Sequence, residues 1–152
     1  MSSKQKRKAT SWAVGVVGLV VVAGVALGVW FILTNRATDP PLGDVSVRQA
    51  KDLIQGHHDD PNFVVLDVRT PQEYDQGHIS GEGITPVNLD FYAADFREQL
   101  AKLDRVKTYL VYCRTGNRSA KTVDLMKELG FRGIYNLEGG ITAWQEAGQP
   151  LK

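Results

Sequence analysis

The sequence predicts an α/β domain with an open parallel sheet flanked by helices, preceded by one transmembrane helix. An uncharged stretch of twenty-one residues, Ala13 to Leu33, lies near the amino terminus. After residue 44, helix-like and strand-like segments alternate, as they do in parallel α/β sheets. The only cysteine, Cys113, stands in a glycine-containing loop between a strand-like and a helix-like run. Together these observations predict a membrane-anchored domain with a candidate site at the end of a strand.

The uncharged stretch is long enough to cross a membrane. At about 1.5 Å per residue, a helix of about twenty residues spans the roughly 30 Å hydrocarbon core. Trp12 and Trp30 lie near its ends, where interfacial aromatic residues are common. A cleaved secretory signal is the alternative, because basic residues precede the stretch. Its apolar region, however, is usually about 7 to 15 residues long and ends in an Ala-x-Ala-like pattern, which is absent here. We therefore expect an uncleaved helix over residues 12–34.

Charge on the two sides of this helix predicts its orientation. Four basic residues lie within residues 1–11, whereas Arg36 alone follows the helix closely. The positive-inside tendency places the amino terminus in the cytoplasm and the domain outside it, in the periplasm if the organism is a bacterium. Residues 35–44, with two consecutive prolines, are expected to form an extended linker.

The domain, residues 45–152, differs in charge from the segment before it. Five basic residues and one acidic residue precede residue 44, so residues 44–152 contain thirteen basic and sixteen acidic residues, a net charge of −3. This balance argues against nucleic acid or anionic lipid as a partner of the domain. A single cysteine forms no internal disulfide and says nothing of the redox compartment.

The first half of the domain contains two helix starts and one strand. Ser46 and Gln49 have the spacing of a capping box that opens a helix to Ile54. The nearly continuous apolar run from residue 63 to residue 68 is typical of a buried parallel strand. Residues 70–73, Thr-Pro-Gln-Glu, combine an N-cap, a proline at the first helical position and a glutamate that completes a second capping box.

Another helix and strand are expected before the cysteine. Asp90 can cap a helix whose apolar residues are four, four and three positions apart. These residues are Tyr92, Phe96, Leu100 and Leu103. A strand is then expected from Thr108 to Tyr112.

The alternation continues after the cysteine loop. A helix ending at Gly130 is expected, and its buried side has helical spacing. The residues on that side are Ala120, Val123, Met126 and Leu129. A last strand is expected from Ile134 to Leu137, and Trp144 is expected to pack in the core of a final helix. No internal repeat is present, so the segment is a single unit.

The loop from Cys113 to Ser119 carries the strongest functional signal. A strand that stops at Cys113 and turns through Gly116 into a helix directs backbone N–H groups and the positive helix end at the sulfur. Arg114 and Arg118 add positive charge, so the thiol should ionise well below its free pKa of about 8.5. A buried, inert cysteine is the alternative, but an apolar site would not bring two arginines with it. The loop therefore predicts a thiolate in an anion-binding cradle.

The loop Cys113-Arg114-Thr115-Gly116-Asn117-Arg118-Ser119 resembles the active-site loop of single-domain rhodaneses, the thiosulfate and persulfide sulfurtransferases. Two further motifs agree in the same order along the chain. Residues 66–79 resemble the strand, turn and helix before the catalytic half, and residues 137–144 resemble the closing strand, double-glycine turn and last helix. The resemblance covers about residues 45–151. The connection over residues 80–86 is longer than is usual in that family.

The resemblance implies a two-step reaction. The Cys113 thiolate would take the outer sulfur of thiosulfate or of a persulfide donor, and a thiol or cyanide acceptor would then remove it from the Cys113 persulfide. Backbone N–H groups of the loop would stabilise the charged sulfur. Arg114 and Arg118 would attract the anionic donor, while Thr115 and Asn117 would shape the mouth of the site.

Other polar residues have a supporting or a solvent-exposed interpretation. Asp67 and Arg69, at a strand end, are expected to orient neighbouring loops by pairing with Glu73 or Arg118 without touching substrate. Residues 57–60, His-His-Asp-Asp, could suggest a metal, but adjacent ligands beside a proline are typical of a solvated turn. We therefore expect neither a metal nor another cofactor.

Two alternative functions share this architecture. Cysteine phosphatases place five residues between the cysteine and the arginine, whereas four separate Cys113 from Arg118. The smaller ring suits a thiolate with one extra sulfur better than a phosphate. A non-catalytic sulfur carrier or docking module would keep the loop without turning over, and the intact Cys113 and Gly116 argue against such a dead site. Sulfur transfer is therefore the activity that the sequence predicts.

Overall fold

The computed structural model describes residues 42–152. The basic amino terminus, the expected transmembrane helix over residues 12–34 and most of the expected linker lie outside the described residues. Within residues 42–152, no helix combines the length and the apolar character that crossing a bilayer requires.

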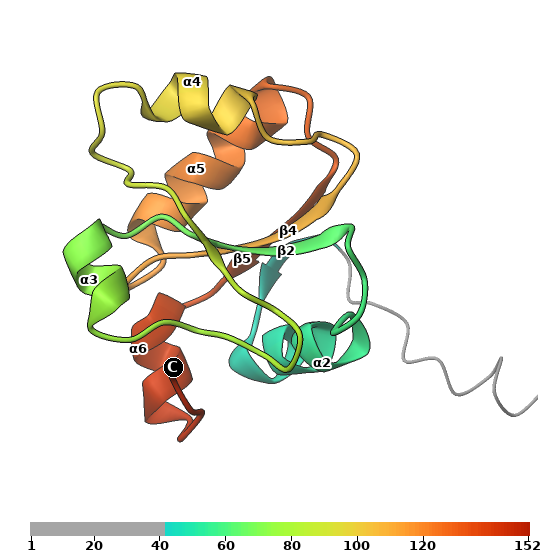
Figure 1. The fold of residues 1–152 in the computed structure, drawn as a ribbon, viewed down its shortest axis with the longest axis vertical. Coiled ribbons are helices and arrows are strands. Elements are labelled where there is room, and N and C mark those ends of the chain that lie inside the picture. The colour runs from blue at the N-terminus through green and yellow to red at the C-terminus, as the bar shows by residue number, and fades with distance from the viewer. Residues whose placement is uncertain (1–41) are drawn as a thin grey trace, which may run out of the picture. The chain divides into compact units, whose positions relative to one another are not determined.

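A five-stranded sheet forms the centre of the domain (Figure 1). Its order is β1-β5-β4-β2-β3, and all four strand pairs are parallel. The strands are β1 (Gly43–Val45), β2 (Phe63–Asp67), β3 (Val87–Asn88), β4 (Thr108–Tyr112) and β5 (Gly133–Leu137). Asp67 is paired with Tyr112, so the carboxyl ends of β2 and β4 lie side by side. Open parallel sheets bind ligands beyond the carboxyl ends of their strands.

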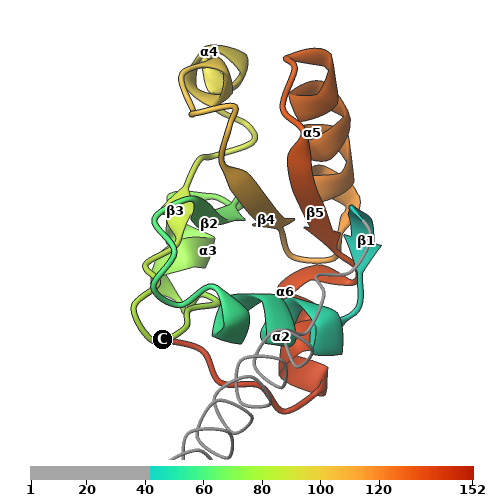
Figure 2. The same cartoon turned by 90° about the vertical axis from the view of Figure 1, so that its right-hand side faces the viewer.

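Helices cover both faces of the sheet. They are α2 (Val47–Gly56), α3 (Pro71–Asp75), α4 (Phe96–Ala101), α5 (Asn117–Glu128) and α6 (Gly140–Glu146). Two of them, α4 and α5, lie on one face, and α2 and α6 lie on the other (Figures 1 and 2). The expected α/β fold with a parallel sheet between helices is confirmed.

Each face of the sheet has its own apolar core. Leu53, Leu110 and Trp144 belong to the core under α2 and α6. Leu66, Val111 and Met126 belong to the core under α4 and α5. Alternate residues of β4 thus enter opposite cores, as the two-residue period of a strand requires. The predicted burial of Trp144 is confirmed, and its indole N–H donates to the carbonyl of Pro150 at 3.0 Å.

The predicted capping boxes are both present. The Ser46 hydroxyl accepts the backbone N–H of Gln49, whose side chain accepts the backbone N–H of Ser46. Thr70 and Glu73 make the same reciprocal pair at the start of α3. Local side-chain chemistry therefore positions both helix starts, as the spacing indicated.

Three expectations about the elements are wrong in detail. Gly43 and Asp44, assigned to the linker, pair with β5 as part of β1. Asp90 does not cap a helix: its carboxylate accepts the N–H of Tyr92 in a turn, and α4 begins only at Phe96. Tyr92 is 69% exposed rather than on a buried helical face.

The buried side of α5 also differs from the expected one. Ala120 is exposed, whereas Ser119 and Thr122 are fully buried beside Val123 and Met126. The Thr122 hydroxyl donates to the carbonyl of Arg118, and the Ser119 hydroxyl lies within hydrogen-bond distance of both the Gly116 carbonyl and the Cys113 sulfur. Because these bonds satisfy the hydroxyls internally, two polar residues replace Ala120 on the face that packs against the sheet.

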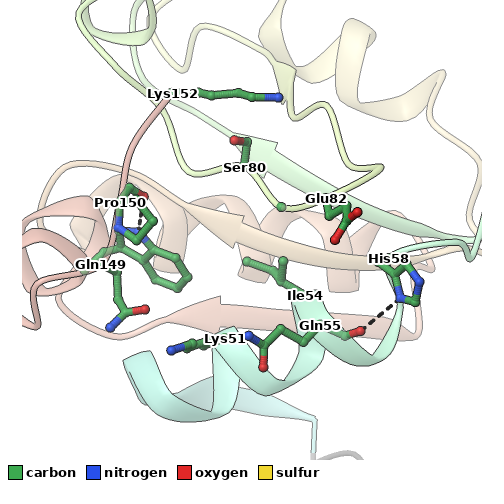
Figure 3. Close-up of a pocket in the computed structure, with 11 residues that line it drawn as sticks. Lys51, Ile54, Gln55, His58, Ser80, Glu82, Gln149, Pro150 and Lys152 are labelled. Atoms are coloured by element: carbon green, nitrogen blue, oxygen red, sulfur yellow. Dashed lines mark hydrogen bonds between the residues drawn. The ribbon is translucent and has the colours of Figure 1, made fainter.

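The long connection over residues 80–86 folds back against the end of α2. Gly81 and Ile84 form an isolated bridge, and Gly83 has a φ of +72°. A Cβ at Gly83 would lie 2.6 Å from the carbonyl oxygen of His58, so the close approach requires glycine. With α2 and residues 149–152, this connection surrounds a cavity of about 620 Å³ (Figure 3). No residue of the cysteine loop lines that cavity.

Candidate active site

Cys113 follows β4 directly and is buried, with 1% of its surface exposed. The backbone N–H of Gly116 donates to its Sγ at 3.2 Å, and the Ser119 hydroxyl lies 3.5 Å from the same sulfur. Gly116 has a φ of +94°, the left-handed conformation that glycine adopts without strain. The loop therefore curls around the sulfur and enters α5 at Asn117. The predicted cradle is present.

The cradle favours the thiolate. Burial by itself raises the pKa of the Cys113 thiol, because it disfavours the charged form. The Ser119 hydroxyl and the backbone N–H groups of Ser119, Thr115 and Gly116 outweigh this effect and bring the pKa below its ordinary value. The direction agrees with the sequence-based expectation.

The backbone at the start of α6 is hydrogen-bonded to the cysteine loop. The N–H of Ile141 donates to the carbonyl of Cys113 at 2.9 Å, and the N–H of Thr142 donates to the carbonyl of Arg114 at 3.1 Å. Gly140 permits this contact: its φ is +59°, and a Cβ there would meet the carbonyl oxygens of Cys113 and Arg114. Sequence reasoning missed this role, although the double glycine was its visible signal.

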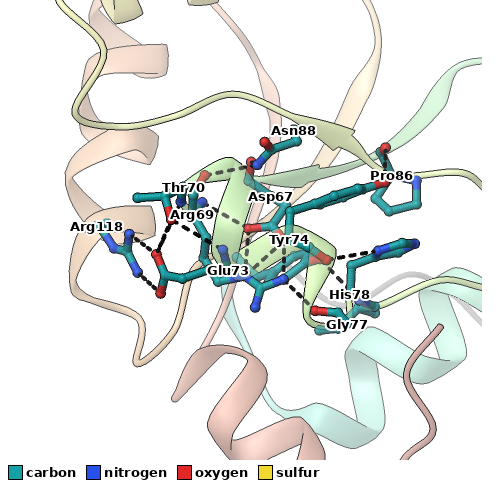
Figure 4. Close-up of polar contacts among 12 residues, drawn as sticks. Asp67, Arg69, Thr70, Glu73, Tyr74, Gly77, His78, Pro86, Asn88 and Arg118 are labelled. Carbon is teal, nitrogen blue, oxygen red and sulfur yellow. Dashed lines mark hydrogen bonds and ion pairs between the residues drawn. The ribbon is translucent and has the colours of Figure 1, made fainter.

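Arg118 pairs with Glu73 rather than facing an open anion site. Its two terminal nitrogens each donate to one Glu73 carboxylate oxygen at 2.8 Å (Figure 4). These bonds, together with the backbone N–H of Thr70, lower the pKa of Glu73 to about 2 despite the opposing effect of burial. The guanidinium also lies 5.5 Å from the ring centroid of Tyr92. That Arg118 attracts the anionic donor stays a prediction, and in this structure its guanidinium is paired with the Glu73 carboxylate.

Asp67 and Arg69 pair with each other, not with Glu73 or Arg118 as expected. The Arg69 side chain donates to both Asp67 oxygens, and both residues are buried (Figure 4). Arg69 also donates to the carbonyl of Gly77 at 2.8 Å. Asn88 donates to the carbonyls of Asp67 and Arg69. Although burial opposes its charge, the pairing with Asp67 raises the pKa of Arg69.

This buried network braces the chain beside the cysteine. Tyr112, the residue before Cys113, has a fully buried ring, and its hydroxyl accepts the N–H of Ile79 at 3.1 Å. Arg69 lies over that ring at 5.5 Å from its centroid. Sequence reasoning missed Tyr112 and Asn88, because their partners lie at least nineteen residues away along the chain.

The remaining loop side chains lie at the surface. Arg114, Thr115 and Asn117 are exposed, as expected for residues at the mouth of the site. His57 contacts Asp60 at 3.3 Å and stacks on Phe63. Within residues 42–152, no cluster of three or more His, Cys, Asp or Glu side chains could hold a metal ion.

The arrangement can stabilise one anionic sulfur at the end of β4. The donors to that sulfur are backbone N–H groups and one buried hydroxyl, all preorganised by the turn into α5. Arg118, in the first turn of α5, is paired with the Glu73 carboxylate. The arrangement can therefore stabilise a thiolate through backbone N–H groups.

The sequence matches the rhodanese-like domain family over residues 48–147. A probable adenylyltransferase/sulfurtransferase MoeZ of Mycobacterium tuberculosis is 41% identical over 106 residues, which are 70% of this chain and 25% of that protein. The chain thus spans about a quarter of the length of that relative. Thiosulfate sulfurtransferase 16, chloroplastic, of Arabidopsis thaliana is 33% identical over 118 residues, covering 71% of this chain and 91% of that protein.

Solved structures agree with the sequence match. The crystal structure of a rhodanese-related protein from Thermoplasma volcanium superimposes with a TM-score of 0.59 at 33% identity. That match covers 72% of this chain and 96% of the other. The family match, the sulfurtransferase-named relatives and the cysteine cradle at the end of β4 all coincide. This chain belongs to the rhodanese-like domain family.

Proposed function

We propose that this protein is a sulfurtransferase that moves a sulfane sulfur through a persulfide on Cys113. The observation that carries the proposal is the cradle around Sγ, with the Gly116 N–H at 3.2 Å and the Ser119 hydroxyl at 3.5 Å. These donors support a negative charge on sulfur before and after the transfer. Two sulfurtransferase-named relatives, at 41% and 33% identity, support the same class of reaction.

In the first step, the Cys113 thiolate attacks the outer sulfur of thiosulfate or of another sulfane donor. A bond forms between Sγ and that sulfur, and the sulfur–sulfur bond of thiosulfate breaks, releasing sulfite with the bonding electron pair. The enzyme is left with an anionic persulfide on Cys113. The cradle lowers the pKa of Cys113, so its thiolate forms more readily than that of an ordinary thiol, and the step uses that thiolate without an adjacent general base.

In the second step, an acceptor removes the sulfur. A thiolate or cyanide attacks the outer sulfur of the persulfide, and the bond to Sγ breaks with its electron pair returning to Cys113. The product is an acceptor persulfide or thiocyanate. The same N–H donors then stabilise the leaving thiolate, so one cradle serves both steps.

The chain's location is also a proposal. The uncharged stretch within residues 12–34 would anchor the protein as a single-pass membrane protein, with residues 1–11 in the cytoplasm and the domain outside it. The support is the length of the stretch and the basic residues before it. Residues 44–152 have a net charge of −3, which favours neither nucleic acid nor anionic lipid as a partner of the domain.

The decisive experiment follows sulfur on the cysteine. Purified residues 42–152 are incubated with thiosulfate, and mass spectrometry is used to look for one added sulfur on Cys113. Cyanide is then added, and thiocyanate is measured over many enzyme equivalents. Added sulfur with repeated turnover supports the enzyme, whereas added sulfur with a single equivalent released would favour a carrier. Aryl phosphate hydrolysis without any persulfide would instead favour a cysteine phosphatase.

A further inference from the structure

The cavity between α2, the connection over residues 80–86 and residues 149–152 has no part in the proposed reaction. Its volume of about 620 Å³ lies within the range of about 300 to 1,000 Å³ typical of small-molecule sites. The residues that line it lie outside the cysteine loop. The connection that closes it is also the segment in which this sequence departs from the usual rhodanese pattern. The cavity is therefore a candidate ligand site separate from the cysteine cradle.

Close contacts within the chain fix the walls of this cavity. A Cβ at Gly81 would clash with the side chain of Ile54, so the connection lies directly on α2. On the opposite wall, the indole N–H of Trp144 donates to the carbonyl of Pro150 at 3.0 Å and holds the chain after α6 in place. Because both walls are already ordered, a ligand would lose little free energy in ordering the site.

Part of the lining is apolar. Ile54, Trp144 and Pro150 line the cavity with hydrocarbon surface (Figure 3). The indole N–H is already bonded to Pro150, so Trp144 offers only its apolar ring to a ligand. Aromatic groups pack favourably against such a ring. This part of the cavity therefore suits an aromatic group.

Charged side chains surround the apolar part. Lys51, on α2, and Lys152 line opposite sides of the cavity (Figure 3), and Lys51 is half-buried. No carboxylate in the described part of the chain forms an ion pair with either lysine. Glu82 is the acidic residue of the lining, and His58 contacts Asp59 at 2.7 Å. Two lysines against one carboxylate leave an excess of positive charge, which complements an anion.

We propose that this cavity binds an aromatic carboxylate. The aromatic group packs on Ile54 and Trp144, and the carboxylate is bound by Lys51. This second site goes beyond the sulfurtransferase function and does not rest on it, because no residue of the cysteine loop takes part. No bond is formed or broken at this site.

The test measures binding of two probes with the same rings. One is 2-naphthoate, and the other is 2-naphthamide, which has no charge. Residues 42–152 contain the whole sheet and both apolar cores, and a dispersed amide spectrum confirms their fold before titration. Trp144 is the only tryptophan among them, so its indole N–H gives a single NMR signal inside the site. The shift of this signal gives Kd for each probe at low and high salt.

Three variants separate charge in the cavity from charge elsewhere. Lys51→Gln removes a positive charge and keeps much of the side chain, and Glu82→Gln removes the negative charge of the lining. Lys121→Gln is the matched control, because Lys121 is an exposed residue of α5, outside the cavity.

The indole signal should shift and saturate with 2-naphthoate. Lys51→Gln should weaken 2-naphthoate binding about fivefold and leave 2-naphthamide binding unchanged. Fivefold corresponds to about 1 kcal/mol, the energy of two opposite charges about 4 Å apart in water. The loss should shrink at high salt, because mobile ions screen exposed charges. Glu82→Gln should have the opposite effect and tighten 2-naphthoate binding, whereas Lys121→Gln should not change it.

Several results would overturn the proposal. If neither probe shifts the indole signal, the cavity binds no aromatic ligand. If 2-naphthamide binds as well as 2-naphthoate, or if Lys51→Gln and Lys121→Gln have equal effects, the cavity does not select an anion through Lys51. Cys113→Ser should bind 2-naphthoate as the unaltered domain does, and loss of binding in this variant would place the probe in the cysteine cradle instead.

Discussion

Two residues define the geometry at the end of β4: Cys113 places a sulfur there, and the backbone N–H of Gly116 donates to that sulfur. The sequence order of strand, cysteine, glycine and helix was sufficient to predict this arrangement. What the order could not reveal was which charges remain free. In the sequence, Arg114 and Arg118 are two arginines of the same loop with nothing to distinguish their charges. In the structure, only Arg118 is paired with Glu73, which lies forty-five positions away along the chain. A tertiary ion pair of that kind leaves no local signal.

Cys113→Ser should abolish sulfur transfer and leave the fold intact. Serine has nearly the same shape, but its hydroxyl does not ionise near neutral pH and cannot form a persulfide. Thiocyanate production from thiosulfate and cyanide should fall to the rate without enzyme, while circular dichroism and the unfolding midpoint stay close to those of the unaltered domain. Activity near the wild-type level would refute the role of Cys113.

Gly140→Ala should damage catalysis more than stability. A Cβ at this position would lie 2.7 Å from the carbonyl oxygen of Arg114, so the loop must shift. A misplacement of about 1 Å costs roughly 100-fold in rate, whereas a non-glycine residue in a left-handed conformation costs about 1 to 3 kcal/mol of stability. Steady-state kinetics and urea unfolding measure the two effects.

Gly148→Ala is the matched control for this change. Gly148 has a φ of +67°, close to the +59° of Gly140, but a Cβ there would meet nothing within 4 Å. The control should therefore show only the loss of stability due to backbone strain, smaller than that of Gly140→Ala, with nearly unchanged kcat/KM. An equal fall in kcat/KM in both variants would mean that strain alone, and not displacement of the loop, explains the effect of Gly140→Ala.

At the scale of elements, the ion pair between α3 and α5 joins the two halves of the site. Glu73 closes the capping box of α3 and also receives Arg118 from the first turn of α5. The capping box was predictable, since it depends on residues three positions apart. The ion pair between Glu73 and Arg118 was not predictable, because Arg118 lies on a different helix, forty-five positions away along the chain.

Glu73→Gln should lower stability in a pH-dependent manner. The pKa of Glu73 is lowered from 4.5 to about 2 in the folded protein, so its contribution is complete above about pH 4.5 and is lost as pH falls towards 2. At pH 7 the variant should be about 1 to 2 kcal/mol less stable, between the values for exposed and buried pairs. Urea unfolding should show this difference shrinking between pH 4.5 and 2.

Asp124→Asn is the corresponding control on α5. Asp124 pairs with Lys127 at 3.5 Å, but both side chains are more than 60% exposed. Removing such a surface pair should change stability by less than about 1 kcal/mol at pH 7. A Glu73→Gln loss no larger than this, or one that persists unchanged at pH 2, would contradict the importance of the ion pair.

Arg118→Ala should reduce activity with thiosulfate and with an uncharged sulfane donor to a similar extent. Because Glu73 already neutralises the guanidinium, its removal should disturb the position of the loop rather than the attraction of an anion. The ratio of kcat/KM for the two donors measures this. A selective loss with thiosulfate would restore the simpler sequence-based view, in which Arg118 attracts the donor directly.

The elements that the sequence predicted poorly are short or lie at the edge of the sheet. Strand β3 has two residues and β1 has three, so neither offers enough alternation to be recognised. The apolar residues after Asp90 have helical spacing. The Asp90 carboxylate nevertheless accepts the backbone N–H of Tyr92, and this turn replaces the first helical hydrogen bonds. The longer helices α2 and α5, of ten and twelve residues, were placed within about two residues.

At the scale of the whole molecule, the order β1-β5-β4-β2-β3 places the site where the sheet is internal rather than at an edge. Cys113 follows the central strand β4, between the ends of β2 and β5. The buried Asp67–Arg69 pair lies at the end of β2, and the double glycine that follows β5 forms the N-cap and the first residue of α6. One strand order thus brings together three motifs that are separated in sequence.

The orientation of the whole chain can be tested with an introduced cysteine. Cys113 is buried and is a poor target for labelling, so the Cys113→Ser background is used. Val106 is 87% exposed and lies away from the loop, so Val106→Cys supplies an accessible thiol on the domain. If residues 12–34 span the membrane with the amino terminus inside, a membrane-impermeant maleimide should label this cysteine in intact cells.

Ser3→Cys, within the basic amino terminus, is the matched control and should be labelled only after lysis. Deleting residues 1–36 should move the domain from the membrane fraction to the soluble fraction. If the membrane is intact and Val106→Cys reacts only after lysis, the proposed orientation is wrong. If the full chain fractionates as soluble protein, the anchor itself is wrong, because a stretch that spans the membrane would keep the chain in the membrane fraction.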